Sequence, residues 1–256
     1  MKLEFSQTTV LYPPVNASDE LLCALDRLTL CVSDGEAVTI IGPSGCGKST
    51  ALRLASGLLA PSSGDVLVDG QPVVKPRQST ALVLQDFGLL PWKSVYANAE
   101  LGLAIHRVDR TERKRRTMAA LEKVGLLDFA SYYPTELSGG MQQRLALARA
   151  IALDVDLLLL DEPLSALDAL LREDLQNLLL ELWLDRRHAQ VLVTHSIEEA
   201  VFLGQRIIVM ATRPGRVVYE MDNPDMGSLE YRSSELYFKR CLELREALAS
   251  AGGEER

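Results

Sequence analysis

A glycine-rich segment of this sequence has residue types and a spacing that suit phosphate binding. Residues 42–50 read GPSGCGKST and fit the pattern G-x-x-x-x-G-K-[ST]. Glycines let successive backbone N–H groups turn toward phosphate oxygens, and a helix N-terminus adds unpaired donors. We expect Lys48 to neutralise the β- and γ-phosphates and the Ser49 hydroxyl to bind Mg²⁺. The predicted nucleotide-contacting residues are Gly42, Pro43, Ser44, Gly45, Cys46, Gly47, Lys48, Ser49 and Thr50.

This phosphate loop by itself supports only nucleotide binding. A small-molecule kinase and an ATPase would both use it. Cys46 lies inside the loop, so we expect a bulky thiol reagent to block ATP binding and ATP to slow the labelling.

A second group of charged residues follows a run of leucines. Residues 157–160 are four leucines, and Asp161 and Glu162 come directly after them. A buried strand that ends in carboxylates delivers them to the carboxyl edge of the sheet, where α/β proteins bind ligands. Asp161 is predicted to hold Mg²⁺, and Glu162 to polarise the attacking water as a general base. Such residues alone are usually solvated, but the phosphate loop favours the functional interpretation.

The elements that must position these residues are short apolar strands and the helices between them. Runs rich in Val, Ile and Leu predict buried strands at residues 37–42, 80–85, 156–161, 190–194 and 206–211. Val66 to Val68, followed by Asp69-Gly70, predicts one arm of a β-hairpin.

Two further regions have helical spacing. Between Pro91 and Leu153 the pattern is helical, which predicts a helical insertion into an α/β core. Near the end, apolar residues recur at helical spacing with charges between them, which predicts an amphipathic helix packed on the body. Its apolar residues are Tyr237, Cys241, Leu244 and Leu248.

A third segment carries a family resemblance. Residues 137–144 read LSGGMQQR, which resembles the signature of the ABC transporter family, and they precede the Asp161-Glu162 strand as in that family. Gln85 resembles the Q-loop glutamine, residues 165–168 the D-loop, and His195 the switch histidine. The resemblance spans about residues 25–218, most of the chain.

The resemblance implies the fold class and the division of the chain. The fold is expected to be α/β, of the P-loop NTPase kind, with a RecA-like core, an N-terminal antiparallel β portion and an inserted α-helical signature subdomain. The ATP-binding core would comprise residues 1–88 and 154–222, the helical subdomain residues 89–153, and the C-terminal helical tail residues 223–256.

The resemblance also implies site roles. Catalytic residues would be Glu162, His195, Gln85 and Lys48, and Mg²⁺ ligands would be Ser49, Gln85 and Asp161. Further nucleotide contacts would come from Tyr12, Ser138, Gly139, Gly140 and Asp168. The signature residues would serve the ATP of a second subunit in a head-to-tail dimer, and Tyr12 would stack on adenine. Met141 replaces the usual glutamine of the signature, which puts one contact to the partner's nucleotide sugar in doubt.

Composition excludes some alternatives. The formal net charge of −8 disfavours DNA or RNA as a main partner, because nucleic-acid binders usually carry a basic field. The four cysteines lack CxxC pairing and metal-ligand spacing, and no secretory leader is predicted, which favours free thiols in a reducing cytoplasm. No apolar run approaches a membrane span, so membrane work would need another chain.

The subgroup resemblance points to an importer. Residues 87–92 (FGLLPW), 195–200 (HSIEEA) and 213–217 (RPGRV) resemble the nitrate, sulfonate and taurine importer ATPases. The implied protein is an ATPase coupled to uptake of a small solute, an anion by this resemblance, at the cytoplasmic face of a bacterial inner membrane. Its partners would be a second copy, membrane permease subunits and, indirectly, a periplasmic or lipid-anchored solute-binding protein.

Three alternatives stay open from the sequence. One is a soluble ABC-type ATPase without a transport role, although no long coiled-coil insertion and no second cassette are visible. Another is the ATPase of an importer for a different solute class. A P-loop metabolite kinase is the third, but it would not need the signature segment.

Overall fold

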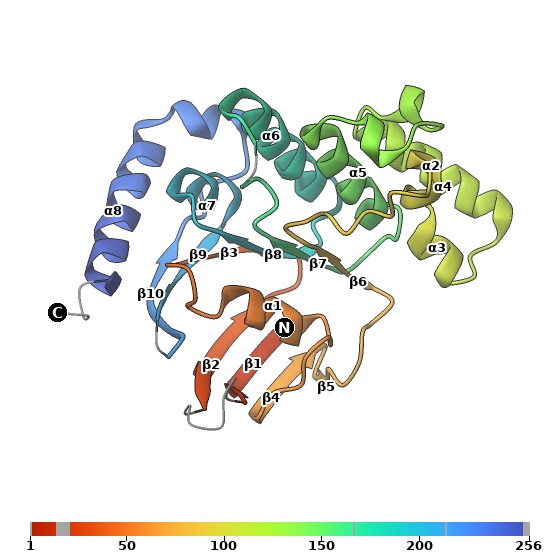
Figure 1. Ribbon diagram of the computed structural model, residues 1–256. Coiled ribbons are helices and arrows are strands. Elements are labelled where there is room, and N and C mark those ends of the chain that lie inside the picture. Colours follow the sequence, from red (N-terminus) through yellow and green to blue (C-terminus); the bar gives the residue numbers. More distant parts are fainter. Residues whose placement is uncertain (1, 14–20, 166, 213, 253–256) are drawn as a thin grey trace.

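The computed structural model of the chain describes residues 2–13, 21–165, 167–212 and 214–252. Ala166 of the predicted D-loop and Arg213 of the RPGRV segment lie outside the described residues. The described chain forms two β-sheets, with helices on the faces and at one end of the larger sheet (Figure 1).

The structure defines each element as follows. The strands are β1 (Leu3–Tyr12), β2 (Leu22–Val32), β3 (Ala37–Ile41), β4 (Ser63–Val68), β5 (Gln71–Pro72), β6 (Thr80–Val83), β7 (Leu157–Asp161), β8 (Ala189–Thr194), β9 (Arg206–Ala211) and β10 (Arg216–Asp222). The α-helices are α1 (Lys48–Ala55), α2 (Val95–Ala99), α3 (Leu101–Ile105), α4 (Arg110–Lys123), α5 (Gly139–Ile151), α6 (Ala169–Arg186), α7 (Ile197–Leu203) and α8 (Glu235–Gly252). Three short 3₁₀ helices are η1 (Leu127–Phe129), η2 (Pro134–Glu136) and η3 (Leu229–Ser233).

The larger sheet has the strand order β10-β9-β3-β8-β7-β6, and only β10 runs antiparallel to its neighbour. Both faces of the central strands β3, β7, β8 and β9 are covered, which explains why these strands are rich in apolar residues, whereas the edge strand β10 alternates exposed and partly buried residues. On β7, Leu157 and Leu159 pack toward the smaller sheet, whereas Leu158 and Leu160 pack toward the helices. Because β3, β8 and β7 are adjacent and parallel, the segments that follow them meet at one edge.

The smaller sheet is antiparallel, with the order β2-β1-β4-β5, and α1 lies between it and the larger sheet (Figure 1). The predicted hairpin is confirmed, since β4 pairs with β5 across Asp69 and Gly70. Both turn residues have positive φ angles, 52° and 72°. Asp-Gly is the pair that favours such a turn, because both residues tolerate the left-handed region.

The five predicted buried strands are confirmed, with small corrections at their ends. The strand expected at residues 80–85 ends at Val83, so Gln85 follows the strand instead of ending it. The chain turns there, since the Phe87 N–H donates to the Leu84 carbonyl oxygen and Phe87 has a φ of 62°. The strand expected at residues 37–42 ends at Ile41, one residue before the phosphate loop begins.

Helices α2–α5 gather at one end of the larger sheet, beyond β6 (Figure 1). The division of the chain into core, helical subdomain and tail stays a prediction. The amphipathic C-terminal helix is confirmed as α8, with Tyr237 and Leu244 buried against α7 and β9. Among the described residues, no helix is both long enough and apolar enough to cross a membrane.

Candidate active site

The loop between β3 and α1 has the backbone shape of an anion-binding nest. Gly45 and Gly47 adopt left-handed φ angles of 83° and 91°, which L-residues with a side chain rarely adopt. A Cβ at Gly47 would also lie 2.5 Å from the Leu25 side chain. Pro43, Ser44 and Gly45 are exposed at the rim of the loop. The loop therefore presents its tip to solvent while its base is fixed by packing.

Lys48 begins α1, and its ammonium group lies over the loop. Nζ donates hydrogen bonds to the carbonyl oxygens of Gly42 (2.7 Å) and Pro43 (3.1 Å). Only 6% of the residue is exposed. A single buried positive charge at the start of a helix adds to the positive end of the helix dipole, so the site attracts anions.

Ser49 and Asp161 are brought together from α1 and the end of β7. The Ser49 hydroxyl donates a 2.9 Å hydrogen bond to the Asp161 carboxylate. Burial raises the pKa of Asp161, and the hydrogen bond from Ser49 opposes that rise. A buried carboxylate beside a hydroxyl is a hard oxygen donor set of the kind that Mg²⁺ prefers. The two residues thus fit the predicted metal site.

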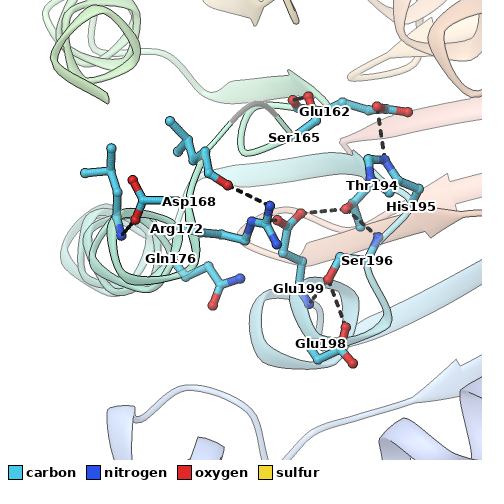
Figure 2. Close-up of polar contacts among 12 residues, drawn as sticks. Glu162, Ser165, Asp168, Arg172, Gln176, Thr194, His195, Ser196, Glu198 and Glu199 are labelled. Carbon is cyan, nitrogen blue, oxygen red and sulfur yellow. Dashed lines mark hydrogen bonds and ion pairs between the residues drawn. The ribbon is translucent and has the colours of Figure 1, made fainter. Parts of the chain in front are cut away.

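Glu162 and His195 meet at the same edge of the sheet. Glu162 Oε2 lies 3.1 Å from His195 Nδ1, although the two residues follow different strands, β7 and β8 (Figure 2). Glu162 has a φ of 46°, in the left-handed region. Such backbone strain costs about 1–3 kcal/mol in a non-glycine residue and concentrates at functional sites. The Glu162 N–H donates to the Val193 carbonyl oxygen, which fixes the turn.

Two residues of the phosphate region differ in their exposure. The Tyr12 hydroxyl lies 3.4 Å from Thr50 Oγ1, so β1 brings this tyrosine to the loop. Cys46 is fully buried, and burial raises the pKa of its thiol. Reagents react with an accessible thiolate. The burial of Cys46 therefore argues against the expectation that a bulky thiol reagent blocks ATP through this residue, and thiol labelling of the folded chain would test it.

Gln85 is exposed in the turn after β6, and the described structure records no hydrogen bond from it to the other predicted catalytic residues. The segment that follows it is held from the signature helix α5. Arg149 donates hydrogen bonds of 2.6 Å to the carbonyl oxygens of Phe87 and Gly88. Burial lowers the pKa of Arg149, and Asp86 opposes that change. Sequence reasoning assigned no role to Arg149. Its two hydrogen bonds hold the segment that follows Gln85 against α5.

The signature residues lie at the N-terminus of α5, among the helices at one end of the larger sheet, whereas the phosphate loop directly precedes α1 (Figure 1). The Ser138 hydroxyl caps its own helix by accepting from the Met141 N–H at 3.4 Å. Gly139 has open space at its Cβ position, whereas Gly140 packs against Leu171. Asp168 similarly caps α6 by accepting from the Leu171 N–H at 3.1 Å. Within one copy, Ser138 and Asp168 therefore serve as helix caps.

Comparison with known proteins identifies the family. The family model described as ABC transporter matches residues 25–165, more than half of the chain. The chain belongs to the ABC transporter family. The resemblance seen in the signature segment is thereby confirmed.

Several curated relatives are named for taurine import. A taurine import ATP-binding protein, TauB, of Rhizobium johnstonii is 47% identical over 199 residues, which cover 78% of this chain and 76% of that protein. TauB of Roseobacter denitrificans is 44% identical over 206 residues, covering 80% and 77%.

Solved structures of ABC cassettes have the same fold. The dimeric structure of MJ0796, a bacterial ABC transporter cassette, is 33% identical with a TM-score of 0.77 and covers 86% of this chain and 98% of that one. A second MJ0796 structure, a dimer in a post-hydrolysis state bound to ADP and Pi, has a TM-score of 0.76 at 33% identity, with coverage of 86% and 98%. The predicted α/β fold class, a P-loop NTPase core with a helical insertion, is confirmed.

Sequence reasoning missed two charged residues beside His195, the predicted switch histidine. Glu199 is 3% exposed, and its carboxylate accepts a 2.5 Å hydrogen bond from the Thr194 hydroxyl (Figure 2). Arg172 Nε lies 3.9 Å from the same carboxylate group. One signal was available in the sequence, because Glu199 precedes Phe202 and Leu203 by three and four residues, the spacing that puts side chains on one face of a helix.

Proposed function

We propose that this chain is the ATP-hydrolysing subunit of an ABC importer and that two copies enclose two ATP molecules head to tail. The imported solute is a small anion such as taurine, another sulfonate or nitrate. The observation that carries the proposal is the Glu162–His195 contact of 3.1 Å, beside the Ser49–Asp161 pair. The names of the 44–47% identical relatives support the importer role and the choice of solute.

Binding of the nucleotide phosphates falls to the loop and Lys48. The loop's N–H groups surround the phosphate oxygens, and the ammonium group exchanges its bonds to Gly42 and Pro43 for bonds to phosphate. Thr50 completes the loop, and Tyr12, 3.4 Å from it, stacks on the adenine.

Ser49 and Asp161 would hold Mg²⁺, with Gln85 reaching it from the turn after β6. Bound Mg²⁺ neutralises charge on the β- and γ-phosphate oxygens. Gln85 moves with a segment that Arg149 ties to α5, so it reports the state of the site to the helical part.

Hydrolysis uses Glu162 and His195. Glu162 accepts a proton from the attacking water, and general-base catalysis contributes about 10²–10⁴-fold in rate. His195 contacts Glu162 through Nδ1, and the imidazolium form, which carries a proton on both nitrogens, would also donate from Nε2 to the γ-phosphate oxygens as charge develops there. His195 is 61% exposed at its side chain and so can face a nucleotide.

A second copy completes each site. In the single chain, Ser138 and Gly139 are exposed at the start of α5, whereas Gly140 is buried. In the head-to-tail dimer these groups donate to the γ-phosphate held by the other copy, and Asp168 contributes from the start of α6. Closing and reopening of this dimer drives the membrane partners.

The remaining partners are membrane permease subunits and, through them, a periplasmic or lipid-anchored solute-binding protein. The chain acts at the cytoplasmic face of the bacterial inner membrane, as a peripheral subunit. Trp92 is 71% exposed just after the Q-loop segment and suits a groove that receives a permease helix.

The first test replaces the general base. Glu162→Gln keeps ATP binding, lowers kcat by about 100-fold or more, and accumulates an ATP-bound dimer visible by light scattering. Glu181→Gln, at an exposed position on α6, is the matched control and should hydrolyse ATP normally. Native turnover in Glu162→Gln would contradict the assignment of the base.

The second test addresses the solute. A bacterial strain lacking this gene is complemented with the native chain or with Glu162→Gln, and uptake of labelled taurine and nitrate is measured. Restored uptake of either anion by the native chain alone supports the importer. Active ATPase without any anion uptake would instead favour a different solute class or a soluble ATPase.

A further inference from the structure

The turn that carries His195 is tied to the start of α6 by an ion pair between a buried carboxylate and a partly exposed guanidinium group (Figure 2). We propose that Arg172 and Glu199 are positioning residues that hold His195 beside Glu162 and couple it to the segment at Leu167 and Asp168. The inference rests on the proposed function, since it assumes that His195 serves hydrolysis.

Glu199 fixes the residue on each side of His195. Its Oε2 accepts a 2.5 Å hydrogen bond from the Thr194 hydroxyl, and Thr194 directly precedes the histidine. Thr194 Oγ1 in turn accepts from the Ser196 N–H at 3.0 Å, and Ser196 directly follows it. The Glu199 N–H donates to Ser196 Oγ at 3.2 Å. Three hydrogen bonds thus define the turn from which the imidazole projects.

Arg172 connects this turn to α6. Its Nε lies 3.9 Å from Glu199 Oε1, and its Nη2 donates a 2.8 Å hydrogen bond to the Leu167 carbonyl oxygen. The next residue along, Asp168, caps α6 at Leu171. The guanidinium group therefore links the end of the D-loop to the carboxylate that holds the histidine turn.

Because Glu199 is buried, the ionised form of its carboxylate depends on its hydrogen-bond and ion-pair partners. A carboxylate that is only 3% exposed needs hydrogen bonds or a positive charge to stay ionised. Burial raises the pKa of Glu199, and the Thr194 hydroxyl, Arg172 and His195 oppose that rise, whereas Glu162 adds to it. Loss of Arg172 would thus remove a positive charge that favours the ionised Glu199 carboxylate, which accepts the hydrogen bond from Thr194.

The link gives the second copy a route to the histidine. Leu170, in the first turn of α6, is 81% exposed, so this end of the helix is open to a neighbour. A neighbour that shifts Leu167 or Asp168 would move the guanidinium group and, through Glu199, the position of His195. Hydrolysis would then respond to dimer closure as well as to bound ATP.

The test measures kcat and KM for ATP in the full-length chain carrying Glu199→Gln or Arg172→Gln. Misplacing a reacting group by about 1 Å can cost about 10²-fold in rate. We expect kcat to fall by about 10–100-fold, with KM within about threefold of native. Asp174→Asn is the matched control, because Asp174 is an exposed acidic residue on α6. It should hydrolyse ATP at the native rate.

Two further variants separate positioning from general destabilisation. Arg172→Lys keeps the charge and should recover part of the kcat lost in Arg172→Gln. The double variant Arg172→Gln/Glu199→Gln should lose no more than the worse single variant, because both act through one link. Arg172 has a 37% exposed side chain, so its variants test the idea even if Glu199→Gln fails to fold.

His195→Ala distinguishes failure of this link from failure of the proposed site. If His195→Ala lowers kcat while Arg172→Gln and Glu199→Gln leave it native, the link is wrong and the site stands. If His195→Ala itself has native kcat, the proposed role of the histidine is wrong. A rise in KM without a fall in kcat for Arg172→Gln would also overturn the link, because it would indicate a binding role.

Discussion

Lys48 Nζ donates a 2.7 Å hydrogen bond to the carbonyl oxygen of Gly42, at the opposite end of the same loop. The lysine thus closes the phosphate loop over its own backbone. The same ammonium group lies 3.8 Å from Cys46 Sγ in the buried base of the loop. The Lys48 ammonium group therefore both packs against the buried base of the loop and faces the expected phosphate site. This position leads to one prediction for Lys48 and one for Cys46.

Replacing Lys48 should weaken nucleotide binding. Lys48→Ala removes the charge that faces the phosphates, and a hydrogen bond to a charged group is worth about 1.5–3 kcal/mol. We expect ATP affinity to fall by about 10–100-fold in calorimetry. Lys114→Ala, an exposed lysine on α4, is the matched control and should bind ATP normally. Unchanged binding by Lys48→Ala would contradict the phosphate-loop assignment.

Cys46 should be the slowest of the four cysteines to react with N-ethylmaleimide. Its side chain is fully buried, whereas Cys23, Cys31 and Cys241 are partly exposed. The thiol pKa does not set Cys46 apart, because burial raises the pKa of Cys23 and Cys241 as well. Peptide mapping by mass spectrometry at timed intervals measures each site. In denaturant all four should react at similar rates. Early labelling of Cys46 in the folded chain would show that the loop base opens.

His188 should make folding stability fall as the solution becomes acidic. Burial lowers the pKa of His188 from its ordinary value near 6.5. The unfolded chain then binds a proton that the folded chain resists, so this contribution to stability is complete above pH about 6.5 and is lost below it. Urea denaturation between pH 7.5 and 5.5 measures the slope.

The variant His188→Gln removes the titrating group and should flatten that slope. His106→Gln, at the end of α3, is the matched control and should keep the native slope. A native slope in His188→Gln would mean that other groups set the pH dependence.

Trp92 should matter for transport and not for hydrolysis by the isolated chain. It projects from a segment fixed by the buried Asn98 side chain, which bonds to the backbone of Leu90, Lys93 and Ser94. Loss of an exposed aromatic anchor at an interface typically costs about 2 kcal/mol or more. Trp92→Ala should lower solute uptake by about 10-fold or more and keep native basal ATPase activity.

An exposed leucine at the other end of the molecule provides the control for Trp92. Leu242 is 60% exposed on α8, and Leu242→Ala should leave uptake unchanged. Co-purification of the permease subunits should be weakened by Trp92→Ala alone. If both variants transport normally, the permease does not use the tryptophan.

The sequence by itself determined the features that depend on local chemistry. The loop pattern at residues 42–50 requires glycines at two left-handed positions and a lysine at the start of a helix, and the structure has them there. The buried strands were visible because a sheet covered on both faces needs apolar side chains in both directions. The Asp69-Gly70 turn was visible because few other pairs adopt two positive φ angles.

Only the tertiary structure decided which distant residues touch and which are buried. Glu162 meets His195 because β7 and β8 pair side by side, and periodicity within each strand does not specify its neighbour. Arg172 meets Glu199 because α6 and α7 pack on the same face of the larger sheet. The strand end at Gln85 was misjudged because the turn at Phe87 is held from a distant helix, through Arg149. Contacts of this kind depend on packing between elements, which a single sequence does not display.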